Sequence, residues 1–503
     1  LAGLSAALQA AENGCNVKLV SSLPSERAQS VMAEGGINAA LNTKDENDSP
    51  EEHFTDTIKA ACGLADPNAV WGMTQAAPEL VHWLLKLGVK FNMSGYDDVD
   101  LRNFGGQKKK RTAFAQSDTG KQIMTAMIDA VRRKEASGMV ERFSHHSFLT
   151  LRLCGNICCG CVIRDEYSQE TVELPGDAVI VATGGMHGLF GNTTGSLSNT
   201  GEVTAELFRL GVPLANGEMI QYHPTTVKCG GKRMLISEAA RGEGGRLFAM
   251  KDGKQWYFME EKYPELGNLM PRDITAREIW KVSHESEVFL DMTEISEEII
   301  SNKLSGLADD CMTYLHKDIR KEPVSVLPGI HYFMGGILVD EQHRTPIQNL
   351  YAAGECCAQY HGANRLGGNS LLGALYGGRV AAKSACEQAD VVDLSCATQI
   401  DFPPASQISE IKQLNKVMQE TMGVVRNENT LLNGIQTVQA LTGNLPLLGM
   451  AVLKSALARK ESRGAHWRED YPKSNDDDYL KTTVARFDGK QIQISFVPVP
   501  ERR

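Results

Sequence analysis

The 503-residue sequence lacks several features that would place it in other protein classes. No apolar run approaches the roughly 20 residues that a membrane-spanning helix needs, and no signal-peptide pattern is present. An excess of basic residues is also missing, because 52 Lys and Arg against 62 Asp and Glu give a net charge of -10. This balance argues against a nucleic-acid partner.

A disulfide framework is absent as well. The 12 cysteines are spread through a long chain and do not resemble the pattern of a small disulfide-rich scaffold. We therefore expect a reducing, cytoplasmic location. Four cysteines cluster in a predicted β-hairpin region, Arg142 to Glu173, but they lack the paired spacing of a zinc site. The interpretation as small buried residues is favoured over a metal site for Cys154, Cys158, Cys159 and Cys161.

What is present fits an enzyme with more than one domain. The chain is 42% hydrophobic and 23% charged, with a mild excess of 47 glycines. Glycine permits the tight turns and close backbone approaches that nucleotide sites need.

The first residues resemble part of a βαβ nucleotide-binding unit. A small-residue helix is predicted over Leu1 to Glu12 and a strand over Asn16 to Val20, followed by Ser21 where an acidic residue commonly holds a ribose. The fold needs a strand and a G-x-G-x-x-G turn before this helix, and Gly3 is a candidate for the third glycine. The sequence is thus expected to begin inside the motif. A plain packed helix–strand pair remains the alternative.

Further glycine-rich segments point to the same kind of site. Adjacent glycines follow Arg27 in Arg27 to Asn38, and a buried strand over Asp177 to Ala182 ends in Thr-Gly-Gly. The turn His361 to Leu371 opens another small-residue helix, whose first N–H groups can hold an electron-rich ligand. Arg365 within this turn offers a five-donor fork suited to a carboxylate.

Helical periodicity covers most of the remaining chain. Apolar residues recur at three- and four-residue spacings in two segments before residue 90 and in three segments after residue 405. The predicted helices are Phe54 to Ala61, Val70 to Leu87, Ile408 to Met422, Glu428 to Thr442 and Leu447 to Arg463, and a strand pair is predicted after them.

Five segments combine a cation or an imidazole with a backbone-fixing glycine or proline. They are His223 to Thr225, Ser237 to Gly245, Met270 to Asp273, His331 to Gly336, and the turn with Arg365. Between His223 and His331 the Gly/Ala-rich pattern gives way to Lys, Glu and aromatic residues, as in an inserted domain. A cleft between two domains would gather the five segments around a doubly anionic ligand.

Each segment also has a structural interpretation. A histidine beside proline is commonly a buried structural residue, and Arg272 with Asp273 fits a helix start. Glu238 and Arg241 are three residues apart, so a one-turn salt bridge would explain both.

In this order, the five segments resemble the flavoprotein subunit of fumarate reductase and succinate dehydrogenase, a superfamily that includes L-aspartate oxidase. The resemblance runs from Leu1 to about Val484 and includes Ala458 to Arg468. It implies an α/β fold: a Rossmann-like FAD-binding domain with an inserted α+β capping domain and a C-terminal helical domain. The implied ranges are 1–222 and 332–390 for the FAD-binding domain, 223–331 for the capping domain, and 402–503 for the helical domain and tail.

The resemblance also implies FAD as the cofactor. Family members usually carry Asp where this chain has Glu202, and membrane-bound members carry a flavin-linking His where it has Gln29. Gln29 predicts non-covalent FAD and favours the fumarate-reducing direction. The residues expected near FAD are Gly3, Ser30, Ala33, Glu34, Gly35, Gly36, Thr183, Gly184, Glu202, Glu355, Ser370 and Leu371.

Substrate and proton-transfer roles follow from the same resemblance. Hydride passes from flavin N5 to one alkene carbon of fumarate, and Arg272 matches the proton donor, with Glu238 and Arg241 as the relay that reprotonates it. The residues expected to bind the dicarboxylate are Phe104, His223, Ser237, His331 and Arg365.

Two other functions stay open from the sequence. L-aspartate oxidase is a close relative with unattached FAD, although Met334-Gly-Gly336 and Leu366 look more like the reductase side. The chain could also be a subunit that docks an iron–sulfur partner through its helical tail, at the inner face of a membrane; intramolecular packing explains that tail equally well. Its own cysteines lack cluster spacing, and no metal is expected in this chain.

Overall fold

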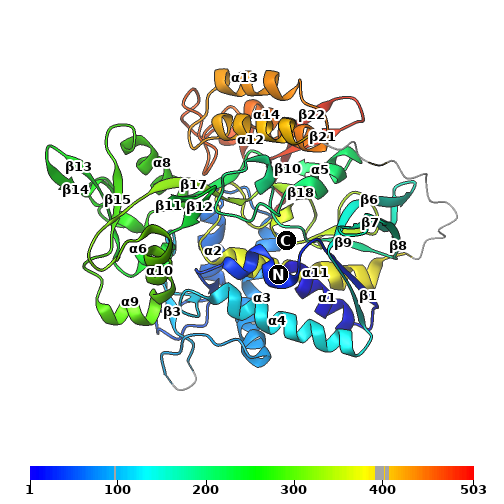
Figure 1. Ribbon diagram of the computed structural model, residues 1–503, viewed down its shortest axis with the longest axis horizontal. Coiled ribbons are helices and arrows are strands. Elements are labelled where there is room, and N and C mark those ends of the chain that lie inside the picture. Colours follow the sequence, from blue (N-terminus) through cyan, green and yellow to red (C-terminus); the bar gives the residue numbers. More distant parts are fainter. Residues whose placement is uncertain (96–97, 391–401, 403–406) are drawn as a thin grey trace.

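Two small-residue helices, α1 (Ala2–Glu12) and α11 (Asn369–Gln388), form the centre of the nucleotide-fold region (Figure 1). The computed structural model describes residues 1–95, 98–390, 402 and 407–503. Ser5 Oγ of α1 donates to the Leu375 carbonyl at 2.7 Å. A Cβ atom at Gly378 would lie 2.4 Å from the Ala2 carbonyl oxygen, so this glycine lets the helices touch. The helix predicted at the start of the chain is confirmed.

Short parallel strand pairs accompany these helices. They are β1 (Val17–Ser21) with β5 (Val140–Ser144), β9 (Val179–Val181) with β19 (Leu350–Ala352), and β18 (Gly336–Leu338) with β20 (Cys357–Ala358). The predicted strands at 16–20 and 177–182 are therefore confirmed. Parallel pairing brings the carboxyl ends of neighbouring strands to one edge, where nucleotides bind in this fold class.

Three helices pack beside this centre, and local sequence fixes where they begin and end. They are α2 (Pro50–Ala60), α3 (Pro67–Leu87) and α4 (Thr119–Ala136), with a small sheet of β2 (Ile37–Asn38), β4 (Thr112–Ala113) and β3 (Leu101–Arg102) beside them. Ser49 caps α2 and Asp66 caps α3, each followed by proline in the first turn. Helix α3 ends at Gly88, whose φ of 100° favours glycine.

The predicted hairpin region forms one antiparallel sheet. Its strands are β6 (His146–Cys154), β7 (Ile157–Asp165) and β8 (Thr171–Pro175). Cys158 and Cys159 are buried in β7, and Cys161 is half-buried. Among the described residues, no group of three or more His, Cys, Asp or Glu side chains could hold a metal ion.

The segment predicted as an inserted domain carries two antiparallel sheets and short helices. Its strands are β11 (Ile220–Cys229), β12 (Lys232–Leu235), β13 (Arg246–Lys251), β14 (Lys254–Trp256), β15 (Val288–Asp291), β16 (Val324–Ser325) and β17 (Leu327–Phe333). Its helices are α6 (Glu238–Gly242), α7 (Phe258–Lys262), α8 (Arg272–Val282), α9 (Glu297–Lys303) and α10 (Ser305–Asp310).

The strand through which the chain enters this region and the strand through which it leaves are neighbours in one sheet. Strands β11 and β17 pair, with Gln221 opposite Tyr332, and the proposed boundaries at 222/223 and 331/332 fall inside them. The division into domains stays a prediction.

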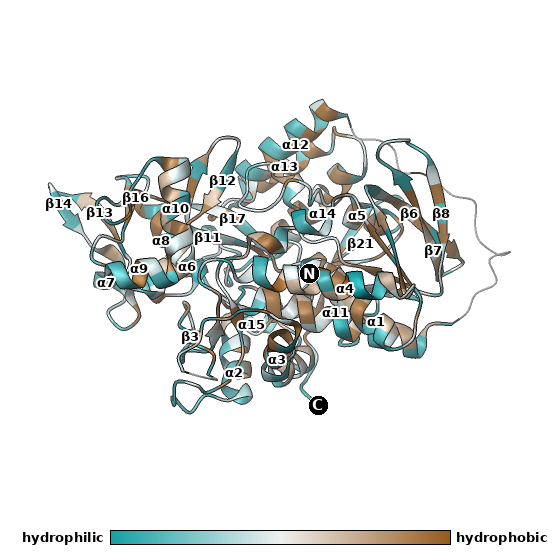
Figure 2. Cartoon of the chain, turned by 60° about the horizontal axis from the view of Figure 1, so that its bottom comes forward, coloured by the Kyte–Doolittle hydropathy of each residue, from teal (hydrophilic) through white to brown (hydrophobic). Residues whose placement is uncertain are grey.

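The C-terminal region is helical but is joined to the rest by a sheet. Its elements are α12 (Ile408–Thr421), α13 (Glu428–Val438), α14 (Asn444–Ala458), α15 (Asp476–Tyr479), β21 (Lys481–Phe487) and β22 (Ile492–Pro498). Figure 2 shows hydrophilic and hydrophobic residues side by side on α12 and α13, as expected of surface helices. The apolar residues Leu414, Met418 and Leu431 pack with Phe208 of α5 (Glu202–Arg209).

Several details differ from the sequence prediction, and α13 ends at Val438 instead of Thr442. Helix α14 ends at Ala458 instead of Arg463, because Arg459 turns to an extended conformation and pairs with buried acids. The predicted strand pair exists, but β21 also pairs with β10 (Leu214–Ala215), so it extends a sheet of the nucleotide-fold region. The helical domain is predicted to start at Phe402. The structure describes this residue, but residues 391–401 and 403–406 lie outside the described residues.

None of the described helices combines the length and the apolar composition that crossing a membrane requires.

Candidate active site

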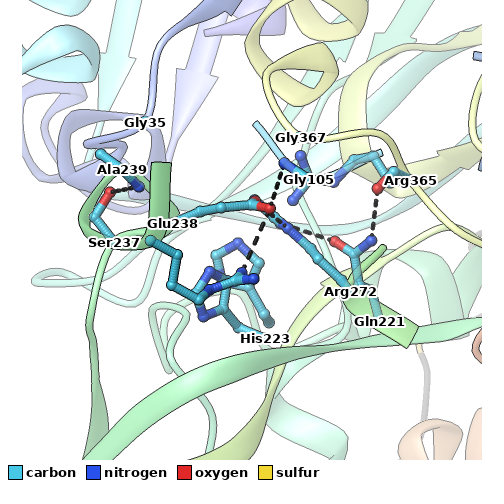
Figure 3. A network of polar contacts seen from close by, with 12 residues as sticks. Gly35, Gly105, Gln221, His223, Ser237, Glu238, Ala239, Arg272, Arg365 and Gly367 are labelled. Carbon is cyan, nitrogen blue, oxygen red and sulfur yellow. Dashed lines mark hydrogen bonds and ion pairs between the residues drawn. The ribbon is translucent and has the colours of Figure 1, made fainter. Parts of the chain in front are cut away.

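Glu238, the first residue of α6, is the centre of a buried polar network (Figure 3). Its side chain is 1% exposed, and its Oε2 accepts from Arg272 Nε at 2.8 Å and lies 2.6 Å from Arg272 Nη2. Its Oε1 accepts from the Gly105 N–H at 3.0 Å and lies 3.4 Å from Arg241 Nη2. Glu238, one of the two predicted relay residues, therefore contacts both the predicted proton donor Arg272 and the second relay residue Arg241.

Local sequence explains why these side chains meet. Ser237 caps α6, its Oγ accepting from the Ala239 N–H at 3.4 Å, so the helix begins with Glu238 pointing into the site. Helix α8 begins at Arg272 directly after Pro271, and Asp273 occupies the favourable first turn. The helix-start interpretation of Arg272 and its place in the network are both correct.

Gln221 of β11 connects this network to the glycine-rich turn. Its Oε1 accepts from Arg272 Nη1 at 3.0 Å, and its Nε2 donates to the Arg365 carbonyl at 2.8 Å. Gln221 is fully buried. The sequence interpretation missed it, although its two-residue spacing from His223 placed both on one face of a strand.

Electrostatics keep the Glu238 carboxyl ionised. Burial alone raises its pKa, but the guanidinium groups of Arg272 and Arg241 outweigh burial and hold the pKa below its ordinary value. Burial lowers the pKa of Arg241, although the Glu238 carboxylate opposes that shift. One buried carboxylate thus serves two guanidinium groups.

The two predicted histidines lie next to each other. The rings of His223 and His331 are 5.1 Å apart at 67°. Burial, and then the nearby Arg272 charge, lowers the pKa of both well below the ordinary value. His331 Nδ1 lies 2.8 Å from Thr194 Oγ1, and His223 Nδ1 lies 3.1 Å from the Thr225 carbonyl. Both imidazoles are therefore neutral hydrogen-bonding groups at neutral pH.

Arg365 carries a buried charge with no carboxylate partner among the described residues. It is 3% exposed, its guanidinium centre lies 4.3 Å above the Tyr332 ring, and its Nε lacks a hydrogen-bond partner. Burial, followed by repulsion from Arg272, lowers its pKa to about 9. Arg241 Nε is likewise without a hydrogen-bond partner.

These residues hold a surplus of positive charge. Three guanidinium groups (Arg241, Arg272, Arg365) accompany the single carboxylate of Glu238, which pairs with two of them. Buried charges are costly unless paired, so such a group is suited to an anion that brings two negative charges. We call these four residues the site cluster.

Phe104 forms an apolar wall beside the network. It is 1% exposed. A Cβ atom at Gly35 would lie 3.0 Å from its Cζ, and one at Gly367 would lie 2.9 Å from its Cδ2. Phe104 therefore lies between two of the glycine-rich segments predicted to bind cofactor and substrate.

The residues predicted near FAD come from several chain segments, and their contact with the cofactor stays a prediction. Helix α11 begins at Asn369 without a side-chain cap, so N–H groups of its first turn can face a ligand. Ser21 Oγ, at the end of β1 where a ribose is expected, is buried without a partner. Gly3 lies near Ala182 (a Cβ there would be 3.5 Å from the Ala182 Cβ), and Glu355 Oε1 accepts from the Phe333 N–H at 3.1 Å.

The remaining predicted cofactor residues occupy loops and helix starts. Ser30 lies in a short helical turn, Gln29–Met32, and the Ala33 carbonyl accepts from the Gly120 N–H at 2.7 Å. Gly36 has a φ of 133°, and a Cβ there would lie 2.5 Å from the Ala113 carbonyl oxygen, so only glycine fits. Thr183 and Gly184 follow β9, while Ser370 and Leu371 lie in the first turn of α11.

Two acids in this group have raised pKa values. Burial, then repulsion from Asp310, raises the pKa of Glu34 to about 8, and its Oε2 has no hydrogen-bond partner. Burial also raises the pKa of Glu202, the first residue of α5. Gln29 Oε1 accepts from the Ser196 N–H at 2.5 Å.

Known proteins match this chain over nearly its whole length. The sequence profile of the family described as "FAD binding domain" matches residues 1–371, and that of "Fumarate reductase flavoprotein C-term" matches residues 441–502. The succinate dehydrogenase flavoprotein subunit of Bacillus subtilis (strain 168) is 38% identical over 567 aligned positions, covering 100% of this chain and 96% of that protein.

More distant matches agree. The 8-methylmenaquinol:fumarate reductase flavoprotein subunit of Wolinella succinogenes is 32% identical, covering 100% of this chain and 91% of that protein. A solved structure of a variant of the E. coli quinol fumarate reductase FrdA has a TM-score of 0.90 at 27% identity, covering 99% of this chain and 95% of that one.

Proposed function

The chain belongs to the flavoprotein subunit family of succinate dehydrogenase and fumarate reductase, and from this premise we propose that it interconverts fumarate and succinate in the fumarate-reducing direction. It is an FAD-dependent oxidoreductase of the class that acts on CH–CH bonds. The observation that carries the proposal of a dicarboxylate substrate is the surplus of buried guanidinium groups around Glu238.

Binding of the dicarboxylate uses both ends of the site. One carboxylate is held by Arg365 and His331, and the other by His223 and the turn that contains Ser237. Arg365 is suited to this role because its buried Nε has no partner, and a carboxylate would accept from its planar fork. The neutral imidazoles add donors without further charge repulsion.

Proton transfer is assigned to Arg272. When bound, FAD supplies hydride to one alkene carbon, and the adjacent carbon then needs a proton. Arg272 is 7% exposed and is oriented by Glu238 on one side and Gln221 on the other. A guanidinium positioned in such a dry site polarises the substrate and donates as negative charge builds.

Glu238 and Arg241 then restore the proton on Arg272. The Glu238 carboxylate contacts both arginines, at 2.6 Å and 3.4 Å, so one side chain bridges donor and relay. The one-turn salt bridge predicted from spacing is also the proton path, and the structural and catalytic interpretations are compatible.

FAD is proposed to be non-covalent. An amide cannot form the flavin link that an imidazole forms, and Gln29 Oε1 is engaged by the Ser196 N–H. A flavin that stayed with the protein after acid precipitation would disprove this assignment.

We also propose that the chain works as a peripheral subunit with an iron–sulfur electron-transfer partner. Relatives in Bacillus subtilis and Wolinella succinogenes are named flavoprotein subunits. Purification of the native complex with iron and acid-labile sulfide would support this assignment, and a fully active single chain would remove it.

The test of the main proposal is anaerobic oxidation of a reduced dye by the purified holoprotein. Fumarate, related enoates and a blank without acceptor are compared, and rapid oxidation with fumarate is expected. Peroxide production that depends on L-aspartate would instead assign the alternative activity, L-aspartate oxidase.

A further inference from the structure

Two cysteines that are 371 residues apart in the sequence lie in contact. Cys15 Sγ and Cys386 Sγ are 2.6 Å apart. Cys15 lies in the turn between α1 and β1, and Cys386 lies in the last turn of α11. Both are half-buried free thiols.

The fold fixes this contact. Ala6 and Ala10 of α1 pack against Ala382 of α11, and Cys15 and Cys386 continue the same small-residue contact. The turn at Gly14, with a φ of 84°, directs the Cys15 N–H to the Ala10 carbonyl at 3.0 Å. Both thiols are therefore held by backbone that the helix pair already orders.

Solvent reaches Cys386 through a groove. A groove of about 900 Å³ runs between α1, α3 and α11, and Cys386 forms part of its lining, with Gln9, Asn13, Trp83 and Lys383. A small water-soluble oxidant can enter such a space. The buried Cys158 and Cys159 do not line this groove.

We propose that Cys15 and Cys386 form a redox modification site, in which a small-molecule disulfide converts the two thiols into a reversible intramolecular disulfide. One of the two cysteines attacks the reagent as its thiolate and releases one thiol, leaving a mixed disulfide on that cysteine. The other cysteine then gives up its proton, attacks the modified sulfur and releases the second thiol. The protein loses two hydrogen atoms and the reagent gains them, so electrons and protons balance.

The surroundings of Cys386 affect how readily this thiol reacts. Burial, and then the hydrogen bond with Cys15, raises the pKa of Cys386 to about 12. A raised pKa slows the reaction of Cys386 as a nucleophile at neutral pH. Within a mixed disulfide at either cysteine, the other sulfur is already in place for the second attack.

The disulfide would link the turn after α1 covalently to the last turn of α11. Both helices begin at segments predicted to hold FAD, so the bond would brace the helix pair behind the cofactor. Because the closed loop is long, we expect the thermal midpoint of the oxidised protein to rise by about 4 °C or more.

The test uses the holoprotein incubated with oxidised glutathione, then blocked with an alkylating reagent and mapped by peptide mass spectrometry without reduction. A peptide pair joined through Cys15 and Cys386, released by dithiothreitol, is the expected result. Cys15→Ser and Cys386→Ser should each abolish the joined pair and leave glutathione on the remaining thiol. Cys229→Ser, a change at another half-buried cysteine, is the matched control and should leave the joined pair intact.

Wild-type protein that carries only mixed disulfides, or no modification at either cysteine, would overturn the proposal. This readout needs neither turnover nor a substrate, so it stands or fails independently of the proposed activity.

Discussion

Two clusters of buried arginines in this molecule differ in how their charges are balanced. In the C-terminal cluster, Arg459, Arg463 and Arg468 pair with four carboxylates, those of Glu218, Glu461, Asp470 and Asp476, at distances of 2.5–2.8 Å. In the site cluster, three arginines accompany only Glu238.

The difference separates structural charge from functional charge. The Arg459 guanidinium also donates to the Tyr479 and Lys481 carbonyls and to Thr483 Oγ1, so its hydrogen-bonding capacity is used within the chain. Arg365 instead has a buried Nε without a partner. A cluster whose arginines are balanced by carboxylates of the same chain stabilises the fold. A cluster with surplus positive charge is suited to bind an anionic ligand.

The largest effect is expected from Arg272→Gln in the site cluster. Loss of the positioned proton donor should lower fumarate turnover by roughly 10³-fold or more. Dye oxidation by the variant measures this, and an unchanged flavin content shows that the fold is intact. Turnover within a few-fold of wild type would remove Arg272 from the chemistry.

Arg459→Met tests the other half of the comparison. The change leaves Glu218 buried without its arginine partner and leaves Glu461 with Arg463 alone, which should cost about 3–5 kcal/mol of unfolding free energy. Urea denaturation followed by fluorescence measures the loss, while turnover per bound flavin should stay at the wild-type value. Wild-type stability in this variant would show that balanced buried charge contributes little here.

Arg365→Lys should have an intermediate effect. Lysine keeps the charge but loses the planar fork, so fumarate turnover should fall by roughly 100-fold while FAD stays bound. The KM for fumarate and the flavin absorbance are measured together. Lys383→Arg, a cation change outside the site cluster, is the control and should leave both unchanged.

The smallest effect concerns Glu34. Its pKa is raised to about 8, so the folded protein binds a proton that the unfolded chain releases at lower pH. Stability should therefore fall as pH rises through that value, and Glu34→Gln should flatten the dependence. Thermal midpoints from about pH 6 to about pH 9 measure it; parallel curves for both proteins would show that Glu34 does not carry the proton.

Local patterns predicted most of the helices and singled out segments that meet in the site cluster, but they did not predict long-range pairing. The small-residue helix at Ala2–Glu12 was predicted from spacing, and α2 and α3 begin at cap residues and prolines that can be read from the sequence. Glu238 and Arg272 were singled out because glycine and proline flank them.

Features that depend on distant partners were missed. Gln221 has no motif of its own, since its role comes from residues 51 and 144 positions away. Helix α14 ends early because Arg459 pairs with Glu218, 241 positions earlier. The contact of Cys15 with Cys386 was equally invisible, because helical packing brings together segments that no local pattern links.

The most direct test of the surplus-charge account compares the binding of malonate and propionate to oxidised holoprotein by titration calorimetry. Malonate carries two carboxylates and has no CH–CH bond to oxidise, whereas propionate carries one carboxylate. Charge-assisted hydrogen bonds of about 1.5–3 kcal/mol each predict that malonate binds at least roughly 100-fold more tightly, with most of this preference lost in Arg365→Lys. Equal affinities for the two acids in wild-type protein would contradict the account.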